Sequence, residues 1–338
     1  MRAARLYPGE RRLRLEDVPA PEPSGDQVLV RVVGAGVCHS DLHVLDGMFD
    51  DFLRFPVTMG HEIAGRVEAL GPEARDLSVG EPVVVMVGWG CGHCEWCVSG
   101  HEQLCPQGDE AGATQDGGFA ELVLVPHRRH VVPLGSIDPL EATPFGCAAL
   151  CSYAAVKRVR PHLAGGSTCV IVGAGGLGQY AIQFARLLTG ATVVAVDARE
   201  ERLAQAKELG ADHGVGAGPE AAEAILELTG GRGAQAVVDF VGTDDSLALA
   251  ARVVGRRGLV ALLGLAGGQV PFGFYSLAPE AALTTVVAGT VLDLQEVVRL
   301  AQAGRITGRV QTYPLERINE ALDDLRAGRV EGRAAVTP

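Results

Sequence analysis

The hydrophobic pattern of the chain changes near residue 150. Before that point, short apolar runs at residues 28–33 and 82–87 are separated by glycine and proline turn residues, which predicts a β-rich region. From there to about residue 285, apolar runs alternate with segments of helical periodicity. This alternation predicts a parallel, doubly wound sheet of the α/β class.

Individual elements follow from the second pattern. Strands are expected at residues 169–172, 192–196, 236–241 and 258–263. Helices are expected at residues 177–188 and 199–209, with another between the last two strands. Two further helices, at 293–303 and 315–327, precede an apolar tail. The apolar segment at 286–292 is a candidate for strand pairing across a subunit interface.

Composition narrows the class of protein. With 338 residues, of which 47% are hydrophobic and 21% charged, the chain can bury a core in about two domains and is not disordered. A net charge of −12 disfavours nucleic acids and anionic membranes as partners. No apolar stretch is long enough to cross a membrane, and the N-terminus leads into no secretory apolar region, so a cytoplasmic location is expected. There, clustered cysteines indicate metal binding rather than disulfides.

A glycine-rich turn follows the strand expected at residues 169–172. The run Gly173-Ala-Gly175-Gly-Leu-Gly178 has the G-x-G-x-x-G spacing and opens a predicted helix, whose free N–H groups suit a pyrophosphate. Spacing alone is weak evidence in a chain with 45 glycines, and an ordinary strand-to-helix turn is the alternative. The strand before the glycine run and an acid after the next strand strengthen its assignment to a dinucleotide site. The candidate dinucleotide contacts are Gly173, Gly175, Gly176, Leu177 and Gly178.

Asp197 ends the next strand, 19 residues after Gly178. A carboxylate there hydrogen-bonds the ribose 2′-hydroxyl and repels a 2′-phosphate, which favours NAD over NADP. Arg199 and Arg202 lie just beyond it. Solvent exposure on a helix is the preferred interpretation of both, with 2′-phosphate binding as the alternative, and Arg202 is kept among the candidate cofactor contacts.

Four cysteines are crowded between residues 91 and 105. Cys91, Cys94, Cys97 and Cys105 match a closed tetrahedral zinc site, which is structural because no ligand position remains for substrate. An iron–sulfur cluster also takes four cysteines, but the spacing differs from the common ferredoxin patterns. A nucleic-acid-binding zinc ribbon is disfavoured by the acidic charge.

The chain resembles the medium-chain, zinc-dependent alcohol dehydrogenases over essentially its whole length. The resemblance depends on Cys38-His-Ser-Asp, Gly60-His-Glu, the four-cysteine segment, Cys147-Ala-Ala-Leu-Cys-Ser-Tyr, the glycine motif and Gly332-Arg333. It implies a Rossmann NAD-binding domain over 149–285. A β-rich, GroES-like catalytic domain is expected from 1–148 and 286–338. The compact length is typical of bacterial relatives, which are often tetramers, so a homo-oligomer is expected, with a tetramer favoured over a dimer.

The resemblance also implies a second, catalytic zinc, so two Zn²⁺ per subunit. Its ligands would be Cys38, His61 and Cys147, with Glu62 as a transient ligand and one position left open for substrate. Asp41 would orient His61. Cys151 stands where the family usually has a hydroxyl residue, close to the nicotinamide.

Further roles are implied around the coenzyme. Ser40 and His43 would carry the released proton toward solvent, because imidazole changes charge near neutral pH. His39 and Arg333 would contact the coenzyme phosphates, arginine being suited to bidentate phosphate binding. The alternative interpretation of His43 and Arg333 is that they are ordinary surface residues.

The expected activity is reversible hydride transfer between an alcohol and NAD. Phe49, Phe52, Val87 and Trp89 flank the ligand segments, which favours a hydrophobic secondary, aromatic or branched alcohol, with packing as the alternative role of Trp89. A polyol or amino-alcohol dehydrogenase of the same fold is the alternative, although Cys147 stands where polyol members often carry an acid. A zinc-binding protein without catalysis is the alternative from a different class, and the intact ligand set argues against it.

Overall fold

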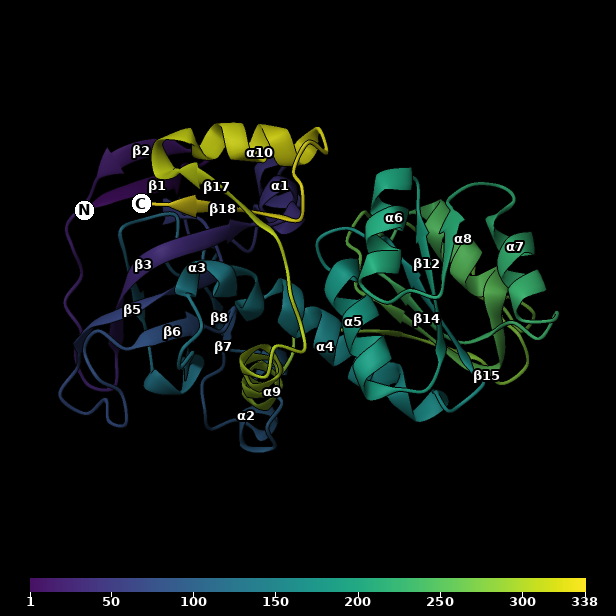
Figure 1. The fold of residues 1–338 in the computed structure, drawn as a ribbon. Coiled ribbons are helices and arrows are strands. Elements are labelled where there is room, and N and C mark those ends of the chain that lie inside the picture. Colours follow the sequence, from purple (N-terminus) through teal and green to yellow (C-terminus); the bar gives the residue numbers. More distant parts are fainter. The chain divides into compact units, whose positions relative to one another are not determined.

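The computed structural model describes residues 1–338 and divides them into two compact units (Figure 1). Unit 1 comprises Met1–Leu150 and Ala288–Pro338, and unit 2 comprises Cys151–Val287. The chain passes from unit 1 to unit 2 inside α4 (Ala148–Val159). Each division lies two residues beyond the boundary expected from the sequence.

Unit 1 is built around a seven-stranded sheet. Its order is β10-β6-β5-β3-β18-β17, and β9 also pairs with β3. The strands are β3 (Val28–Val37), β5 (Glu62–Leu70), β6 (Pro82–Val85), β9 (Leu122–Val125), β10 (Val131–Pro133), β17 (Val310–Pro314) and β18 (Arg333–Thr337). The late strand β18 lies between β3 and β17, so residues more than 290 positions apart are sheet neighbours. The apolar side chains of β3, β5 and β6 fill the core of this unit.

Smaller elements complete unit 1. A three-stranded sheet has the order β2-β1-β4, and a two-stranded sheet pairs β7 with β8. These strands are β1 (Arg2–Leu6), β2 (Arg14–Asp17), β4 (Val57–Thr58), β7 (Gly88–Trp89) and β8 (Asp109–Glu110). The helices are α1 (His39–Leu45), α2 (Glu95–Val98), α3 (Pro139–Ala142), α9 (Val291–Gln302) and α10 (Ile318–Arg326). Helix α10 buries Ile318, Leu322 and Leu325 in the core of the unit.

Unit 2 is a six-stranded parallel sheet with the order β13-β12-β11-β14-β15-β16. This is the 3-2-1-4-5-6 order of a dinucleotide-binding Rossmann fold. The strands are β11 (Thr168–Val172), β12 (Thr192–Asp197), β13 (His213–Gly216), β14 (Ala234–Asp239), β15 (Val254–Leu262) and β16 (Ala282–Thr285). The helices are α5 (Gly178–Leu188), α6 (Glu200–Glu208), α7 (Ala221–Leu228) and α8 (Asp244–Val253). Strands β11 and β14 are buried along nearly their whole length, as strands covered on both faces are.

The expected strands and helices of unit 2 and of the C-terminal region are confirmed, most with ends shifted by one to three residues. The segment at 286–292 is different. The strand ends earlier, at Thr285, and Thr290 then caps α9 by accepting a hydrogen bond from the backbone N of Asp293 at 3.1 Å. Within a single chain this segment is therefore not a strand, and its last two residues, 291 and 292, begin α9 instead. Pairing across a subunit interface stays a prediction. None of the helices combines the length and apolar character needed to cross a bilayer.

Candidate functional site

The first group of metal-binding side chains lies where β3 ends and β5 begins. Strand β3 leads into Cys38, the residue that caps α1, while His61 and Glu62 stand at the start of β5. Antiparallel pairing sets Gly36 opposite Glu62, which brings Cys38 beside His61. Cys147, just before α4, supplies the third sequence segment. The ligand atoms of Cys38, His61, Glu62 and Cys147 all lie within 4.8 Å of one another.

Asp41 fixes the orientation of His61. Its Oδ2 accepts a hydrogen bond from the backbone N of Cys38 at 2.8 Å, and its Oδ1 lies 3.4 Å from Nδ1 of His61. Burial lowers the pKa of His61, but Asp41 and Cys38 together outweigh it and raise that pKa well above its usual value. With Nδ1 facing Asp41, Nε2 of His61 is directed to the other side, 3.3 Å from Oγ of Ser40. A carboxylate behind a histidine is a common arrangement for a zinc ligand.

Cys38 is set up as a thiolate. The hydrogen bond from Cys147 lowers its pKa well below the usual thiol value, against the effect of burial, and His61 and Arg333 lower it further. A zinc ligand must be deprotonated, so this environment favours metal binding. The soft sulfur donors of Cys38 and Cys147 and the imidazole of His61 form a donor set that suits zinc and leaves one position of a tetrahedron open.

Glu62 and Arg333 form a buried ion pair beside this group. Arg333 opens β18, and its guanidinium donates a hydrogen bond to Oε1 of Glu62. Burial raises the pKa of Glu62, and Arg333 opposes that shift. The other carboxylate oxygen, Oε2, is buried with no hydrogen-bond partner. An unpartnered buried oxygen within reach of the ligand atoms fits an occasional metal ligand. Arg333 is only 3% exposed, and its Nε is buried without a hydrogen-bond partner.

The four cysteines at 91–105 form the second group. The Sγ atoms of Cys91 and Cys97 are 3.9 Å apart, and those of Cys94 and Cys105 are 3.7 Å apart. A zinc–sulfur distance of about 2.3 Å implies roughly 3.8 Å between the corners of a tetrahedron. The spacing of the sulfurs therefore fits a closed zinc site. Hydrogen bonds from the backbone N–H groups of His93 and Cys94 lower the pKa of Cys91 to about 6, which favours the thiolate form that binds zinc.

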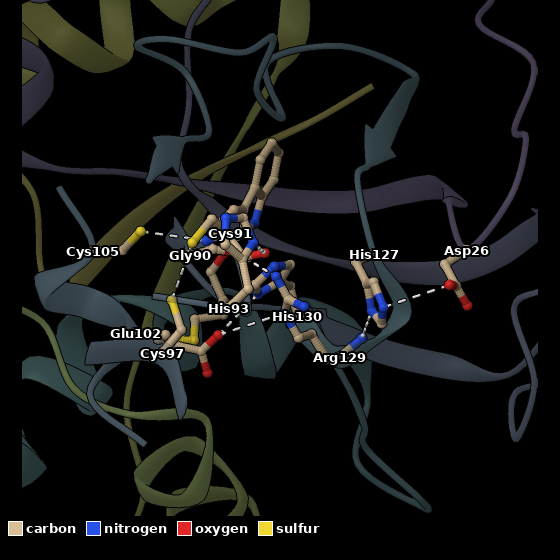
Figure 2. A network of polar contacts seen from close by, with 12 residues as sticks. Asp26, Gly90, Cys91, His93, Cys97, Glu102, Cys105, His127, Arg129 and His130 are labelled. Carbon is tan, nitrogen blue, oxygen red and sulfur yellow. Dashed lines mark hydrogen bonds and ion pairs between the residues drawn. The ribbon is translucent and has the colours of Figure 1, made fainter. Parts of the chain in front are cut away.

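Arg129 links this cysteine segment to the residues that precede β10. Its guanidinium donates to the carbonyl of Gly90, immediately before Cys91, and its Nε lies 3.8 Å from Glu102, which precedes Cys105 (Figure 2). A side chain at Gly92 would collide with the same guanidinium. His130 immediately precedes β10, and its Nδ1 lies 3.6 Å from the carboxylate of Glu102. Burial, with smaller effects of Arg129 and His127, lowers the pKa of His130 to about 3. The sequence gives no signal for Arg129, Glu102 and His130, since nothing in their spacing distinguishes them from surface charges.

The glycine motif of unit 2 forms the turn between β11 and α5. Gly173 has a φ of 87°, a conformation that favours glycine. A side chain at Gly178 would collide with the carbonyl of Gly173, so glycine there lets the helix pack closely on the strand. Asp197, at the end of β12, accepts hydrogen bonds from the backbone N of Ala174 at 2.9 Å and of Arg199 at 3.1 Å. The acid is thus joined directly to the glycine turn.

Arg202 also lies at this turn. Its guanidinium is 3.6 Å from Asp197, and it would be the nearest neighbour of a side chain placed at Gly175. Of the remaining candidates, His39 is exposed and Ser40 and His43 are partly buried on α1. Two of the four expected pocket residues, Val87 and Trp89, are buried, and the Trp89 indole donates to the carbonyl of Met86 at 2.8 Å. Phe52 is 48% exposed.

Comparisons with known proteins agree with this site. Residues 24–136 match the family model of the alcohol dehydrogenase GroES-like domain, and residues 176–303 match that of the zinc-binding dehydrogenases. The NAD-dependent alcohol dehydrogenase of Sulfurisphaera tokodaii is 38% identical, with 100% of both chains covered. The D-arabinose 1-dehydrogenase (NADP(+)) of Saccharolobus solfataricus is 35% identical, over 100% of this chain and 97% of that protein. The crystal structure of the Aeropyrum pernix alcohol dehydrogenase has 36% identity, complete coverage of both chains and a TM-score of 0.94.

A GroES-like unit with two metal-binding groups and a Rossmann unit define a zinc-binding dehydrogenase of the medium-chain type. Within that class, the chain belongs to the zinc-dependent alcohol dehydrogenase family. It is an NAD-dependent oxidoreductase that uses two zinc ions.

Proposed function

We propose the following roles for residues of this chain in the oxidation of an alcohol by NAD and in the reverse reduction. Cys38, His61 and Cys147 hold the catalytic zinc, with Glu62 as a transient ligand. Cys91, Cys94, Cys97 and Cys105 hold the structural zinc. When bound, zinc supplies a Lewis acid for the substrate oxygen, and NAD accepts the hydride. The observation that supports this assignment best is the convergence of four donor atoms from three chain segments within 4.8 Å.

Ser40 receives the proton lost by the substrate hydroxyl. Its Oγ lies 3.3 Å from Nε2 of His61, on the side of the ring that faces away from Asp41. His43 is one helical turn further along α1, on the same face as Ser40, where it takes part in passing the proton to solvent. The two side chains act in sequence because a hydroxyl conducts a proton and an imidazole stores it near neutral pH.

Asp197 hydrogen-bonds the adenosine ribose, and the Gly173–Gly178 turn receives the pyrophosphate, with backbone N–H groups of Gly175, Gly176 and Leu177 as donors. His39 and Arg202 contribute weaker polar contacts to the coenzyme. Arg333 contacts a coenzyme phosphate through those guanidinium N–H groups that do not bond to Glu62. Pairing with Glu62 limits this contact, so we expect Arg333 to contribute less to NAD affinity than an unpaired arginine.

The alcohol has two candidate classes. The sequence favours a hydrophobic secondary, aromatic or branched alcohol, but Val87 and Trp89 belong to the packed interior of unit 1. The second candidate, a polyol or sugar, is favoured by the similarity to a D-arabinose 1-dehydrogenase over the whole chain.

The test is NADH formation at 340 nm with a panel of secondary, aromatic and polyhydroxylated alcohols, using NAD and NADP in parallel. We expect reduction of NAD that is abolished by a zinc chelator and by Cys38→Ser. Absence of turnover in protein shown to contain two zinc ions would overturn the assignment.

We further propose that the protein works in the cytoplasm as a homo-oligomer, with a tetramer favoured over a dimer. All eight cysteines are free thiols, which suits a reducing compartment. Strand β16 is the edge of the unit 2 sheet, and the preceding residues Phe272, Phe274 and Tyr275 are 78%, 92% and 93% exposed. Aromatic residues this exposed and an open strand edge each favour subunit contact. Sedimentation velocity of the wild type and of Phe274→Ser tests it, and a monomeric wild type would contradict it.

A further inference from the structure

Two neighbouring acids in β8 are used very differently. The carboxylate of Asp109 accepts hydrogen bonds from Oγ1 of Thr114 at 2.9 Å and from Nε2 of Gln115 at 3.1 Å. It also pairs with the guanidinium of Arg54 at 3.2 Å. The carboxylate of Glu110 is partly buried and has no hydrogen bond or ion pair in the structure of residues 1–338. Successive residues of a strand point to opposite faces, so the two acids face different surroundings.

The backbone of Glu110 is held rigidly. Its N donates to Oγ1 of Thr114 at 2.8 Å, and its carbonyl accepts from the backbone N of Ala113, Thr114 and Gln115 at 3.1–3.2 Å. Glu110 also stands opposite Gly88 in the β7–β8 pair. A position with this many backbone constraints presents its side chain from a fixed point, as a specific binding residue must.

The same turn packs against the residue before His61. A side chain at Gly112 would meet the backbone N of Gly60 at 2.8 Å. The charges of His61, Asp41 and Cys38 all act on Glu110, and burial raises the pKa of its carboxyl. Glu110 nevertheless lies outside the group of side chains that converge to hold the catalytic metal. It therefore lies beside the metal group without being one of its ligands.

A partly buried carboxyl group without a partner is costly, and its usual partner is a donor that arrives with a ligand. A hydroxyl group suits this position in either protonation state, because it donates to a carboxylate and accepts from a carboxylic acid. An ammonium group requires the ionised form, which burial disfavours here. A hydroxyl group therefore fits Glu110 in both protonation states, whereas a cation fits only one of them.

We propose that Glu110 determines substrate specificity by hydrogen-bonding a second hydroxyl group of the substrate, so that the preferred substrates are diols, polyols or sugars. This inference rests on the alcohol dehydrogenase activity proposed above and selects between its two substrate classes. Simple hydrophobic alcohols lack the second hydroxyl and leave Glu110 unpartnered, which lowers their kcat/KM.

Matched substrates test this directly. 2-Butanol and 2,3-butanediol differ by one hydroxyl, and 3-amino-2-butanol replaces that hydroxyl with an amine. For the wild type we expect a higher kcat/KM with the diol than with 2-butanol. In Glu110→Leu the diol-to-butanol ratio should fall roughly tenfold to hundredfold, as expected for loss of a hydrogen bond to a carboxyl group. Glu110→Gln, which keeps hydrogen-bonding capacity, should retain part of the ratio.

Asp109→Asn is the matched control, since it alters the adjacent acid and should leave the ratio unchanged. A ratio that Glu110→Leu does not alter overturns the proposal. The proposal is also overturned if Glu110→Leu lowers kcat/KM for 3-amino-2-butanol and not for the diol, because the partner of Glu110 would then be a cation.

A binding measurement separates this proposal from the proposed activity. In zinc-loaded protein, 2,3-butanediol should raise Tm more than 2-butanol does, and Glu110→Leu should abolish the difference. If the wild type turns over no alcohol but shows this Tm difference, the activity fails and the role of Glu110 stands. If it turns over alcohols without any difference between the matched substrates, the role of Glu110 fails and the activity stands.

Discussion

Arg333 and Glu62 are 271 positions apart in the sequence and form an ion pair in the interior of unit 1, next to Cys38. Neither side chain has appreciable contact with solvent. The glycine at position 36 makes room for the pair, since a side chain there would collide with the Glu62 carboxylate. A buried carboxylate beside a metal group is thus held by an arginine from the other end of the chain.

Replacing Arg333 with Met should destabilise the protein by about 3–5 kcal/mol, because Glu62 is left buried without its partner. Urea unfolding of the zinc-loaded protein measures this. The double variant Arg333→Met, Glu62→Leu should recover much of the loss, since neither charge then remains. Arg329→Met is the control, because Arg329 is exposed and pairs with Asp324 at the surface. Equal stability of Arg333→Met and wild type would show that the pair does not support the fold.

Arg129→Gln should accelerate release of the structural zinc. The guanidinium links the carbonyl before Cys91 to Glu102, so its removal frees both ends of the cysteine segment. We expect roughly tenfold faster release, at the lower end of the effects of residues that orient metal ligands. Competition with a chromogenic chelator measures the rate. The neighbouring Arg128→Gln is the control, since Arg128 pairs with Asp76 at the surface. Similar release rates for the two variants would contradict the role of Arg129.

His130 should make stability depend on pH. An unfolded histidine takes up a proton below about pH 6.5, whereas burial lowers the pKa of His130 to about 3 in the folded protein. Between these values the unfolded state binds more protons. Stability is therefore complete above pH 6.5 and falls by about 1.4 kcal/mol per pH unit as pH decreases toward 3.

The charged and titratable groups around His130 are Glu102, Arg129 and His127. His130→Phe keeps an aromatic ring against Trp89, whose ring centre lies 6.5 Å away, and removes the titrating group. Its stability should decrease less between pH 6.5 and 5.5 than that of the wild type, in unfolding experiments with zinc content monitored. An unchanged slope would mean that His130 is not the group responsible.

Asp197→Asn should shift coenzyme preference toward NADP. The amide keeps an acceptor for the backbone N of Ala174, removes the charge that repels a 2′-phosphate, and releases Arg202 from its ion pair. We expect the NAD-to-NADP ratio of kcat/KM to fall roughly tenfold to hundredfold, as for loss or gain of one hydrogen bond to a charged group. Asp212→Asn is the control, since Asp212 precedes β13 of the same sheet and pairs with Arg186. A ratio unchanged by Asp197→Asn would remove Asp197 from coenzyme selection.

The sequence predicted those features whose physical cause is local. The strand before Gly173 and the helix after Gly178 show their periodicity in consecutive residues, and the four cysteines at 91–105 are close in the chain. The grouping of Cys38, His61 and Cys147 could not be predicted from neighbouring residues. Their separations carry no geometric information, and only the resemblance to a family brought them together before the sheet register did.

The rest could not be predicted because it depends on which side chains meet after folding. Nothing in the sequence indicates that Arg333 reaches Glu62, since that contact requires β18 to lie beside β3. Asp109 and Glu110 are equivalent acids in the sequence, and only the turn at Thr114 and Gln115 distinguishes the partnered one from the other. The position of Trp89 near the ligand segments allows both a pocket role and a packing role, and only the structure shows that it packs in the core.

The place of β18 in the sheet also determines the order in which the chain can fold during synthesis. Every strand of the Rossmann unit is synthesised before β17 and β18, so that unit can fold before the sheet of unit 1 is complete. Unit 1 begins earlier but its sheet stays incomplete, because β3 and β17 lack the strand that lies between them until residues 333–337 emerge. Until then Glu62 has no arginine, and the half of the protein made first is the half completed last.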